Sequence, residues 1–223
     1  MKLEFWLDYI SPLCYKQHLE IESLFKKYTF EDLELLYRSY EMIPGFIPLE
    51  DCTFYRVLSH HHVLTDDEVK MTFQDIPEQL KPVKVMDIHR LSHLAKKMDL
   101  SFEFNKQVFK TYYVEKQDIS NHDVLRRVAK KVGIQASHVD EVLNTDQFMS
   151  AVEMNRENAI VKGIFEIPHL RIDGKIRLSG FHTESQILEA LTMASVQYRT
   201  SDFCEGEHCA RKKTRWVFFY RFL

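Results

Sequence analysis

The chain contains few of the residues that break helices or cross-link small folds. Its 223 residues include only 6 glycines, 6 prolines and 4 cysteines. Together with a hydrophobic content of 45%, this composition favours a globular, helix-rich protein. No run of about 18 apolar residues occurs, so no transmembrane segment is expected. The net charge is −3, and without an excess of basic residues no nucleic acid partner is expected.

The N-terminal residues and the cysteines bear on the compartment. The N-terminus enters a predicted strand at once and has no basic segment followed by an apolar one. No secretory signal is therefore predicted, and the protein is expected to be cytoplasmic. In a cytosolic protein of this size, four cysteines do not predict a structural disulfide framework. Cys52 has no other thiol near it in the sequence and is interpreted as structural or incidental.

The two cysteines near the C-terminus are close together in the sequence. Cys204 and Cys209 are separated by four residues, which allows a small closed loop. Such a pair could oxidise by itself or pass electrons through Cys14. The alternatives are a zinc site completed by His208 and two unpaired thiols. Residues 210–223, which are basic and then aromatic, could lie on a lipid surface or pack as a terminal strand.

The spacing of apolar residues predicts a small sheet that is interrupted by helices. Asp173-Gly174 lies between two short apolar runs and predicts a hairpin turn. The order of predicted elements indicates an α/β fold with a helical insertion. In residue numbers it is a strand from 3, a helix from 12, a strand at 33–40, helices over about 51–162, strands at 167–173 and 175–179, and a closing helix at 183–197.

The segment Ser11-Pro12-Leu13-Cys14 carries the first candidate site. Ser11 is a good N-cap, and Pro12 suits the first helical position because its missing N–H costs nothing there. Free N–H groups and the helix dipole stabilise an anion at such a helix start, so a nucleophilic thiolate fits there. Here the first position holds the Ser11 hydroxyl and only the Cys14 thiol remains. The ordinary alternative is a buried structural cysteine behind an N-cap.

A proline precedes the late hairpin. Ile167-Pro168 stands just before the predicted strand that leads into Asp173-Gly174. Proline removes a backbone donor and leaves neighbouring backbone groups open to pair with an extended substrate. The ordinary alternative is a proline at the entrance of a strand.

Segments over nearly the whole chain resemble one family. Together they resemble the DsbA-like thioredoxin superfamily in its FrnE-like branch, where the turn reads C-P-x-C. The segments that carry the resemblance are residues 8–15 (DYISPLCY), 36–44 (LYRSYEMIP), 88–96 (IHRLSHLAK), 118–125 (DISNHDVL), 163–168 (GIFEIP) with 172–175 (IDGK) and 179–180 (SG), and the C-x-x-x-x-C of 204–209.

The resemblance implies a thioredoxin-like α/β fold with a large all-helical insertion. It places a thioredoxin-like domain at residues 1–48 and 162–198, a helical insertion domain at 49–161, and a C-terminal tail at 199–223. It also implies a cis bond between Ile167 and Pro168. The activity that it implies is thiol–disulfide exchange with protein or small-molecule thiols and disulfides, and a homodimer is compatible with it.

The departures from the family pattern leave three functions open. Ser11 replaces the attacking cysteine, while Glu166 and His169 replace a glycine and a small or hydroxyl residue. The S-P-x-C turn also resembles kappa-class glutathione transferases and 2-hydroxychromene-2-carboxylate isomerases, whose serine binds a glutathione thiolate. The protein is therefore a thiol–disulfide oxidoreductase, a thiol-dependent transferase or isomerase that uses Ser11, or a non-catalytic binding protein. The candidate catalytic residues are Ser11, Cys14, Cys204 and Cys209, and the candidate substrate-binding residues are Pro12, Ile167 and Pro168.

No metal and no resident cofactor are expected, although a low-molecular-weight thiol such as glutathione could serve as a co-substrate. The histidines at residues 60–62 are interpreted as a solvated turn. His89 and His93 are one helical turn apart, but the family helix carries a histidine there without implying a metal. Cys14, inside the helix start, is expected to be partly buried and less reactive than Cys204 and Cys209.

Overall fold

The computed structural model describes residues 1–48 and 80–200, with side chains as far as Ser195, and six single residues between these ranges: Thr53, Arg56, Ser59, Thr65, Asp67 and Val69. Several predictions therefore fall outside the described residues. They concern Cys52, the histidines at 60–62, Cys204, Cys209 and the aromatic tail at 210–223.

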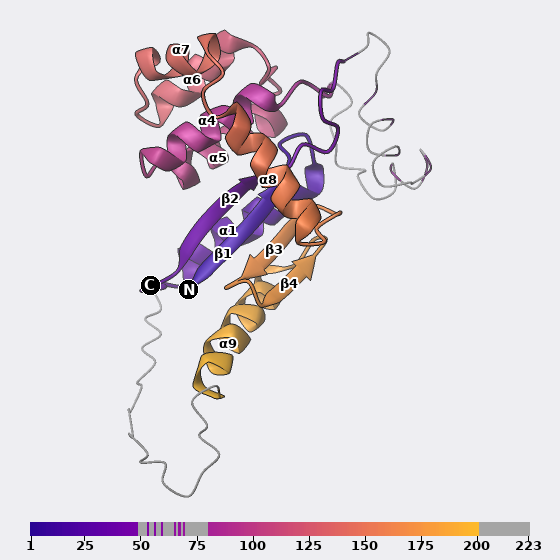
Figure 1. Cartoon of the computed structure of the whole chain (residues 1–223), viewed down its shortest axis with the longest axis vertical. Coiled ribbons are helices and arrows are strands. Elements are labelled where there is room, and N and C mark those ends of the chain that lie inside the picture. Colours follow the sequence, from indigo (N-terminus) through magenta and orange to yellow (C-terminus); the bar gives the residue numbers. More distant parts are fainter. Residues whose placement is uncertain are drawn as a thin grey trace, which may run out of the picture.

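A four-stranded mixed sheet forms the centre of the molecule, in the order β2-β1-β3-β4 (Figure 1). Strand β1 (Lys2–Leu7) pairs in parallel with β2 (Glu34–Ser39) and antiparallel with β3 (His169–Ile172). Strand β4 (Ile176–Ser179) pairs antiparallel with β3. Asp173 and Gly174 join β3 to β4 with φ angles of 47° and 70°, which confirms the predicted hairpin turn.

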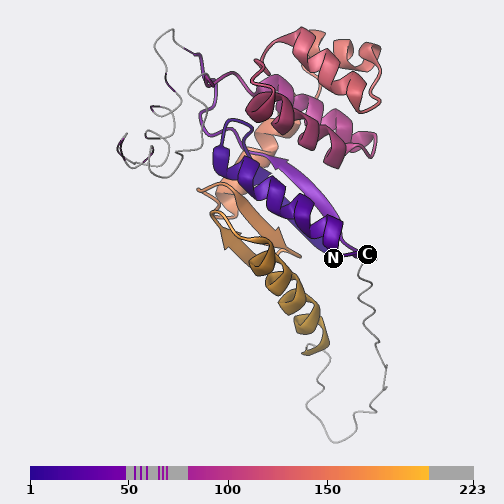
Figure 2. The ribbon, with the colours of Figure 1, turned by 180° about the vertical axis from the view of Figure 1, so that it is seen from behind.

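Helices cover both faces of this sheet. Helix α1 (Pro12–Lys27) connects β1 to β2, and it packs beside α9 (Glu184–Thr200) on one face (Figure 2). Helix α8 (Met149–Val161) crosses the other face and contacts β2 (Figure 1). The other helices whose full range is described pack together at one end of the sheet. They are α4 (Met86–Lys97), α5 (Ser101–Phe109), the π-helix η1 (Lys110–Val114), α6 (His122–Lys131) and α7 (Ala136–Asn144).

The strand–helix order agrees with the sequence prediction. The described residues between β2 and β3 form helices and connecting turns but no strand. The α/β fold with a helical insertion is thus confirmed. Boundaries differ by a few residues, and the first strand of the hairpin begins at His169 rather than at Ile167.

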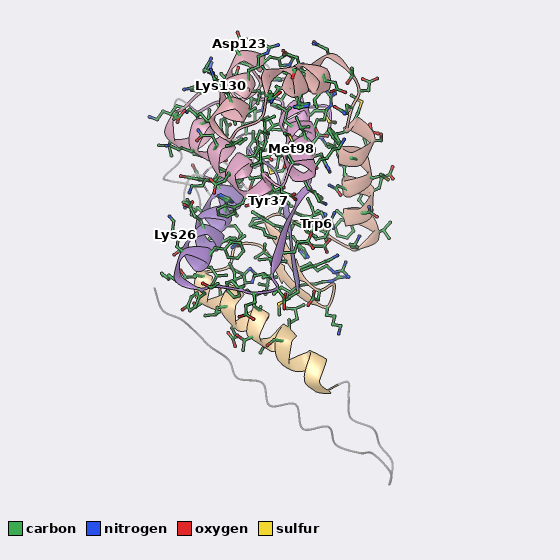
Figure 3. The ribbon with its side chains drawn as sticks, turned by 90° about the vertical axis from the view of Figure 1, so that its left-hand side faces the viewer. Trp6, Lys26, Tyr37, Met98, Asp123 and Lys130 are labelled. Atoms are coloured by element: carbon green, nitrogen blue, oxygen red, sulfur yellow. The ribbon has the colours of Figure 1, made fainter. Side chains whose placement is uncertain are left out.

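Strand β1 is buried on both faces because it is central and both faces are covered. Phe5 contacts Tyr37 of β2, whose hydroxyl hydrogen-bonds His18 of α1 at 3.1 Å. Trp6 points to the opposite side, toward α8 (Figure 3). There the Lys162 ammonium lies 5.9 Å from the centre of the indole ring. This double coverage explains why the last three residues of β1, Phe5, Trp6 and Leu7, are all apolar and buried.

Buried polar contacts join the helical segment to the sheet and connect helices within that segment. The Tyr9 hydroxyl, just after β1, donates to Oδ1 of Asn105 in α5 at 2.6 Å. Arg90 of α4 is buried and donates to the Gln147 carbonyl at 2.9 Å, and also to the carbonyls of Val142 and Thr145. These carbonyls follow the end of α7 or lie in its last turn, so the guanidinium satisfies acceptors that a helix end leaves open.

None of the helices in the described part of the chain combines the length and apolar character needed to cross a membrane.

Candidate active site

The turn between β1 and α1 has the predicted geometry. Ser11 is the N-cap of α1, with extended backbone angles, and its Oγ accepts a hydrogen bond from the Cys14 N–H at 3.3 Å. Pro12 occupies the first turn, and the Ser11 N–H donates to the Asp8 carbonyl at 3.2 Å. The sequence thus places one hydroxyl and one thiol at the positive end of a 16-residue helix.

Cys14 is fully buried, with 0% of its surface exposed. The sequence predicted only partial burial of Cys14, whereas the side chain is completely buried. Burial raises the pKa of the Cys14 thiol to about 12; a hydrogen bond to Ser11 and one to the Asp8 backbone oppose this, and the Asp8 charge adds to it. At that pKa, only about one thiol in 10⁵ is ionised at pH 7. Because the thiolate is the reactive form, Cys14 is a poor nucleophile in this state.

The buried carboxylate of Asp8 accepts hydrogen bonds from the backbone of the turn and of the chain after β2. Oδ2 of Asp8 accepts from the Met42 N–H at 2.7 Å, and Oδ1 accepts from the Ile10 N–H at 3.3 Å. Nε2 of His89 lies 3.8 Å from Oδ1 and has no hydrogen-bond partner among the described residues. Because it accepts from both Ile10 and Met42, Asp8 connects the turn to the chain after β2. Burial raises the pKa of nearby Glu41, and His89 opposes that rise.

The two helix histidines have separate partners. His89 faces Asp8 and its ring lies 4.9 Å from the ring of Tyr9. His93 instead lies 2.8 Å from the Ser39 hydroxyl through its Nε2. Within the described residues, no group of three or more potential ligands could hold a metal ion.

Aromatic side chains form a wall beside the first turn of α1. The rings of Tyr15 and Tyr113 are stacked, with centres 4.5 Å apart and planes at 2°. Phe109 lies 5.8 Å from Tyr15. Tyr113 belongs to the π-helix η1, within the range of about 51–162 over which the sequence predicted helices. No local sequence signal distinguishes this π-turn from a regular helix, since adjacent residues such as Val108 and Phe109 are also both buried in the α-helix α5.

The proline segment lies at the same edge of the sheet as the turn. The register pairs Trp6 with His169, so its continuation places Pro168 beside the end of β1. The bond between Ile167 and Pro168 is cis, both residues are buried, and the Pro168 carbonyl accepts from the Gly180 N–H at 2.9 Å. The candidate residues Ser11, Pro12, Cys14, Ile167 and Pro168 therefore gather at one end of the sheet.

His169 follows the proline and is 3% exposed. Its ring meets Trp6 edge-on, with ring centres 6.1 Å apart, and neither ring nitrogen has a hydrogen-bond partner among the described residues. Burial, then Arg177 and Arg171, lower the pKa of His169 to about 4. The side chain is neutral at physiological pH and lies on the α8 side of the sheet, as Trp6 does.

The comparison with protein families gives one match. The model of the DSBA-like thioredoxin domain matches residues 2–192. No curated protein matches the chain.

Solved structures with similar folds include three with informative descriptions. A probable DsbA oxidoreductase from Streptomyces coelicolor is 20% identical, with a TM-score of 0.77 over 88% of this chain and 91% of that chain. A 2-hydroxychromene-2-carboxylate isomerase is 15% identical, with a TM-score of 0.61 over 90% and 98%. The cytosolic disulfide reductase DsbM from Pseudomonas aeruginosa, solved with GSH, is 11% identical, with a TM-score of 0.56 over 90% and 98%. At these identities the likeness shows a shared fold.

Proposed function

This chain belongs to the family of DSBA-like thioredoxin domains, and from that premise we propose that it is an enzyme of thiol chemistry in which Ser11 binds the sulfur of a glutathione-type thiol. The proposal rests on the different states of the hydroxyl and the thiol in the turn. Ser11 caps α1, whereas Cys14 is buried and protonated.

Disulfide exchange within the turn would need a thiolate. The first position has no sulfur, and a thiol with a pKa of about 12 supplies almost no thiolate at neutral pH. Cys14 is therefore a structural residue in this proposal, and the reactive sulfur comes from a second molecule.

Ser11 has the chemistry to hold that sulfur as an anion. Its oxygen accepts the Cys14 N–H, and its hydroxyl hydrogen, which contacts the Cys14 sulfur here, is the group that would be donated to an incoming sulfur anion instead. The first-turn N–H groups of α1 and the helix dipole favour negative charge at the same place. Because Ser11 is fully buried, binding requires the covering residues to move and admit the thiol.

The proline segment supports a peptide-like ligand. Pro168 contributes no N–H, and its carbonyl is occupied by Gly180. In this proposal the backbone of Ile167 pairs with an extended peptide such as glutathione, and because Ile167 is buried, this pairing also requires the covering residues to move. A neighbour in fold, DsbM, was solved with GSH, which is consistent with this ligand class.

A second candidate is dithiol exchange through Cys204 and Cys209. The spacing of these residues favours it, because four intervening residues allow a small disulfide loop. In that case the tail supplies the thiol pair, and the Ser11 turn with Ile167 and Pro168 positions the substrate.

Glutathione binding measured by calorimetry tests the main proposal. We expect Ser11→Ala to weaken glutathione binding by roughly tenfold or more, because a hydrogen bond to a charged sulfur is lost. Asn121→Ala is the matched control, because it removes the N-cap of α6 and leaves the turn intact. If Ser11→Ala binds as the parent does, Ser11 does not hold the sulfur.

Insulin reduction in the presence of glutathione separates the two candidates. The main proposal predicts that Cys204→Ser/Cys209→Ser retains glutathione-dependent activity. Loss of that activity in the double variant, with normal activity in Ser11→Ala, assigns the chemistry to the tail. Inactivity of the parent toward insulin and in glutathione conjugation would leave a thioredoxin-like binding protein.

A further inference from the structure

Tyr113 carries a buried hydroxyl with no hydrogen-bond partner among the described residues. The residue is 7% exposed and belongs to the π-helix η1. Two nearby tyrosines differ from it. Tyr9 donates to Asn105 at 2.6 Å, and Tyr112 donates to the Lys81 carbonyl at 2.7 Å. A buried hydroxyl without a partner lowers stability, so its presence calls for an explanation.

The position of Tyr113 links it to the turn. Its ring is stacked on Tyr15, the residue after Cys14, with ring centres 4.5 Å apart. Burial raises the pKa of Tyr113 well above its usual range, and the neighbouring Tyr112, Cys14, Asp8 and Tyr15 raise it further. The hydroxyl therefore stays protonated and able to donate, on a ring that lies against Tyr15 near the start of α1.

Tyr113 lies in the π-helix η1, directly after α5. Three consecutive residues of η1, Thr111, Tyr112 and Tyr113, are buried. The wider π-turn changes the direction of the side chains that follow it relative to a regular α-helix. Such single π-turns occur frequently at functional sites.

We propose that the Tyr113 hydroxyl is a second donor to the sulfur anion that Ser11 binds, so that the thiolate lies between two hydroxyl groups at the start of α1. This inference rests on the proposed function. The helix start attracts the anion, Ser11 donates from the cap, and Tyr113 donates from the aromatic wall. The bound thiol then supplies the partner that the Tyr113 hydroxyl lacks.

The test compares Tyr113→Phe with the parent by calorimetry, using glutathione and S-methylglutathione as probes. The phenyl ring keeps the stack on Tyr15 and removes only the hydroxyl. We expect glutathione to bind roughly 10- to 100-fold more weakly, because a donor to a charged group is lost. S-methylglutathione cannot form a thiolate, so its affinity should be unchanged.

Two further measurements separate this role from a structural one. The melting temperature of Tyr113→Phe should equal or exceed that of the parent, because an unpartnered buried hydroxyl has been removed. The ultraviolet absorbance of the bound thiolate should require a higher pH to develop in Tyr113→Phe. Tyr112→Phe is the matched control: it loses the bond to Lys81 and should be less stable, with unchanged discrimination between the two probes.

The outcomes distinguish this inference from the proposed function. Weak glutathione binding in Ser11→Ala with normal binding in Tyr113→Phe would overturn the role of Tyr113 and leave the proposed function standing. A lower melting temperature with unchanged glutathione binding in Tyr113→Phe would mean that the hydroxyl is held by a structural water. Failure of the parent to bind glutathione would overturn both.

Discussion

The Ser39 hydroxyl, at the end of β2, lies 2.8 Å from Nε2 of His93 on α4. Asn155 of α8 completes the contact, with its Nδ2 3.3 Å from both the Ser39 Oγ and the His93 Nε2. The His93 ring is stacked on Phe148 at 6.1 Å between ring centres. A strand and two helices far apart in sequence therefore meet in one small polar cluster.

This cluster predicts a measurable coupling between Ser39 and His93. Ser39→Ala and His93→Phe should each lower the free energy of unfolding by roughly 0.5–1.5 kcal/mol, because each removes a hydrogen bond, while Asn155 remains as a partner of the group that is left. The double variant should lose less than the sum, with an interaction energy on the order of 1 kcal/mol. Urea denaturation of the four proteins measures the coupling, and additive losses would contradict it.

Three histidines predict that stability falls in mild acid. Burial is the largest cause that lowers the pKa values of His18, His93 and His169 to about 4, below the ordinary value of 6.5. The unfolded chain therefore binds protons more readily than the folded chain between about pH 6.5 and pH 4. Stability is full above about pH 6.5 and decreases as the pH falls through that window.

His18 gives the size of the effect for one histidine, because its side chain is 1% exposed and solvent does not screen it. A pKa lowered from 6.5 to about 4 corresponds to roughly 3 kcal/mol that is lost by the time the pH falls below 4. Urea unfolding at several pH values should show the decrease, and replacement of His18 by glutamine should make it smaller by the His18 contribution, while His93 and His169 still contribute. Replacement of the exposed His138 by glutamine is the control. A parent whose stability is constant from pH 7 to pH 4 would contradict the burial argument.

The thiols should differ sharply in reactivity. Cys14 should be alkylated more slowly than Cys204 and Cys209, because its thiol is fully buried and its pKa is raised to about 12. Timed alkylation followed by mass spectrometry measures each site. In urea the difference should disappear, since burial is its cause. Faster labelling of Cys14 than of both tail cysteines would overturn the ordering.

The sequence predicted the parts of the fold that depend on local signals. The Ser11 cap and Pro12 predicted the start of α1, because both act on the backbone of that turn. Asp173-Gly174 predicted the hairpin, because its positive φ angles suit these two residues. The gathering of Ile167 and Pro168 beside the turn followed from the family resemblance rather than from a local pattern.

Features that depend on tertiary packing were not predictable. The Asp8 carboxylate, just after β1, accepts a hydrogen bond from the Met42 N–H, which follows the neighbouring strand β2. Nothing near Asp8 in the sequence indicates that partner. The stack of Tyr113 in the π-helix on Tyr15 of α1 joins residues far apart in the sequence, and no local pattern indicates it. The domain boundaries, the FrnE-like branch, the cytoplasmic location and a homodimer remain predictions.

The turn itself offers the most direct test of the missing thiol. Ser11→Cys creates the sequence C-P-L-C, and the helix start should lower the pKa of the new thiol, whereas burial opposes this. We expect the variant to reduce or oxidise a model disulfide faster than the parent, because it now has an attacking thiol and Cys14 can resolve the mixed disulfide. The rate of insulin reduction measures the gain. The weaker cap should cost about 1 kcal/mol of stability.

The double variant Ser11→Cys/Cys14→Ala is the control for this gain. It keeps the attacking thiol without the resolving one, so it should form a mixed disulfide with the substrate and then stop. Turnover by Ser11→Cys alone would therefore assign the resolving role to Cys14, which requires the buried thiol to become accessible once a disulfide forms. If Ser11→Cys shows no gain and Ser11→Ala binds glutathione normally, the turn is not a reaction centre. Any redox chemistry of the chain would then be confined to Cys204 and Cys209.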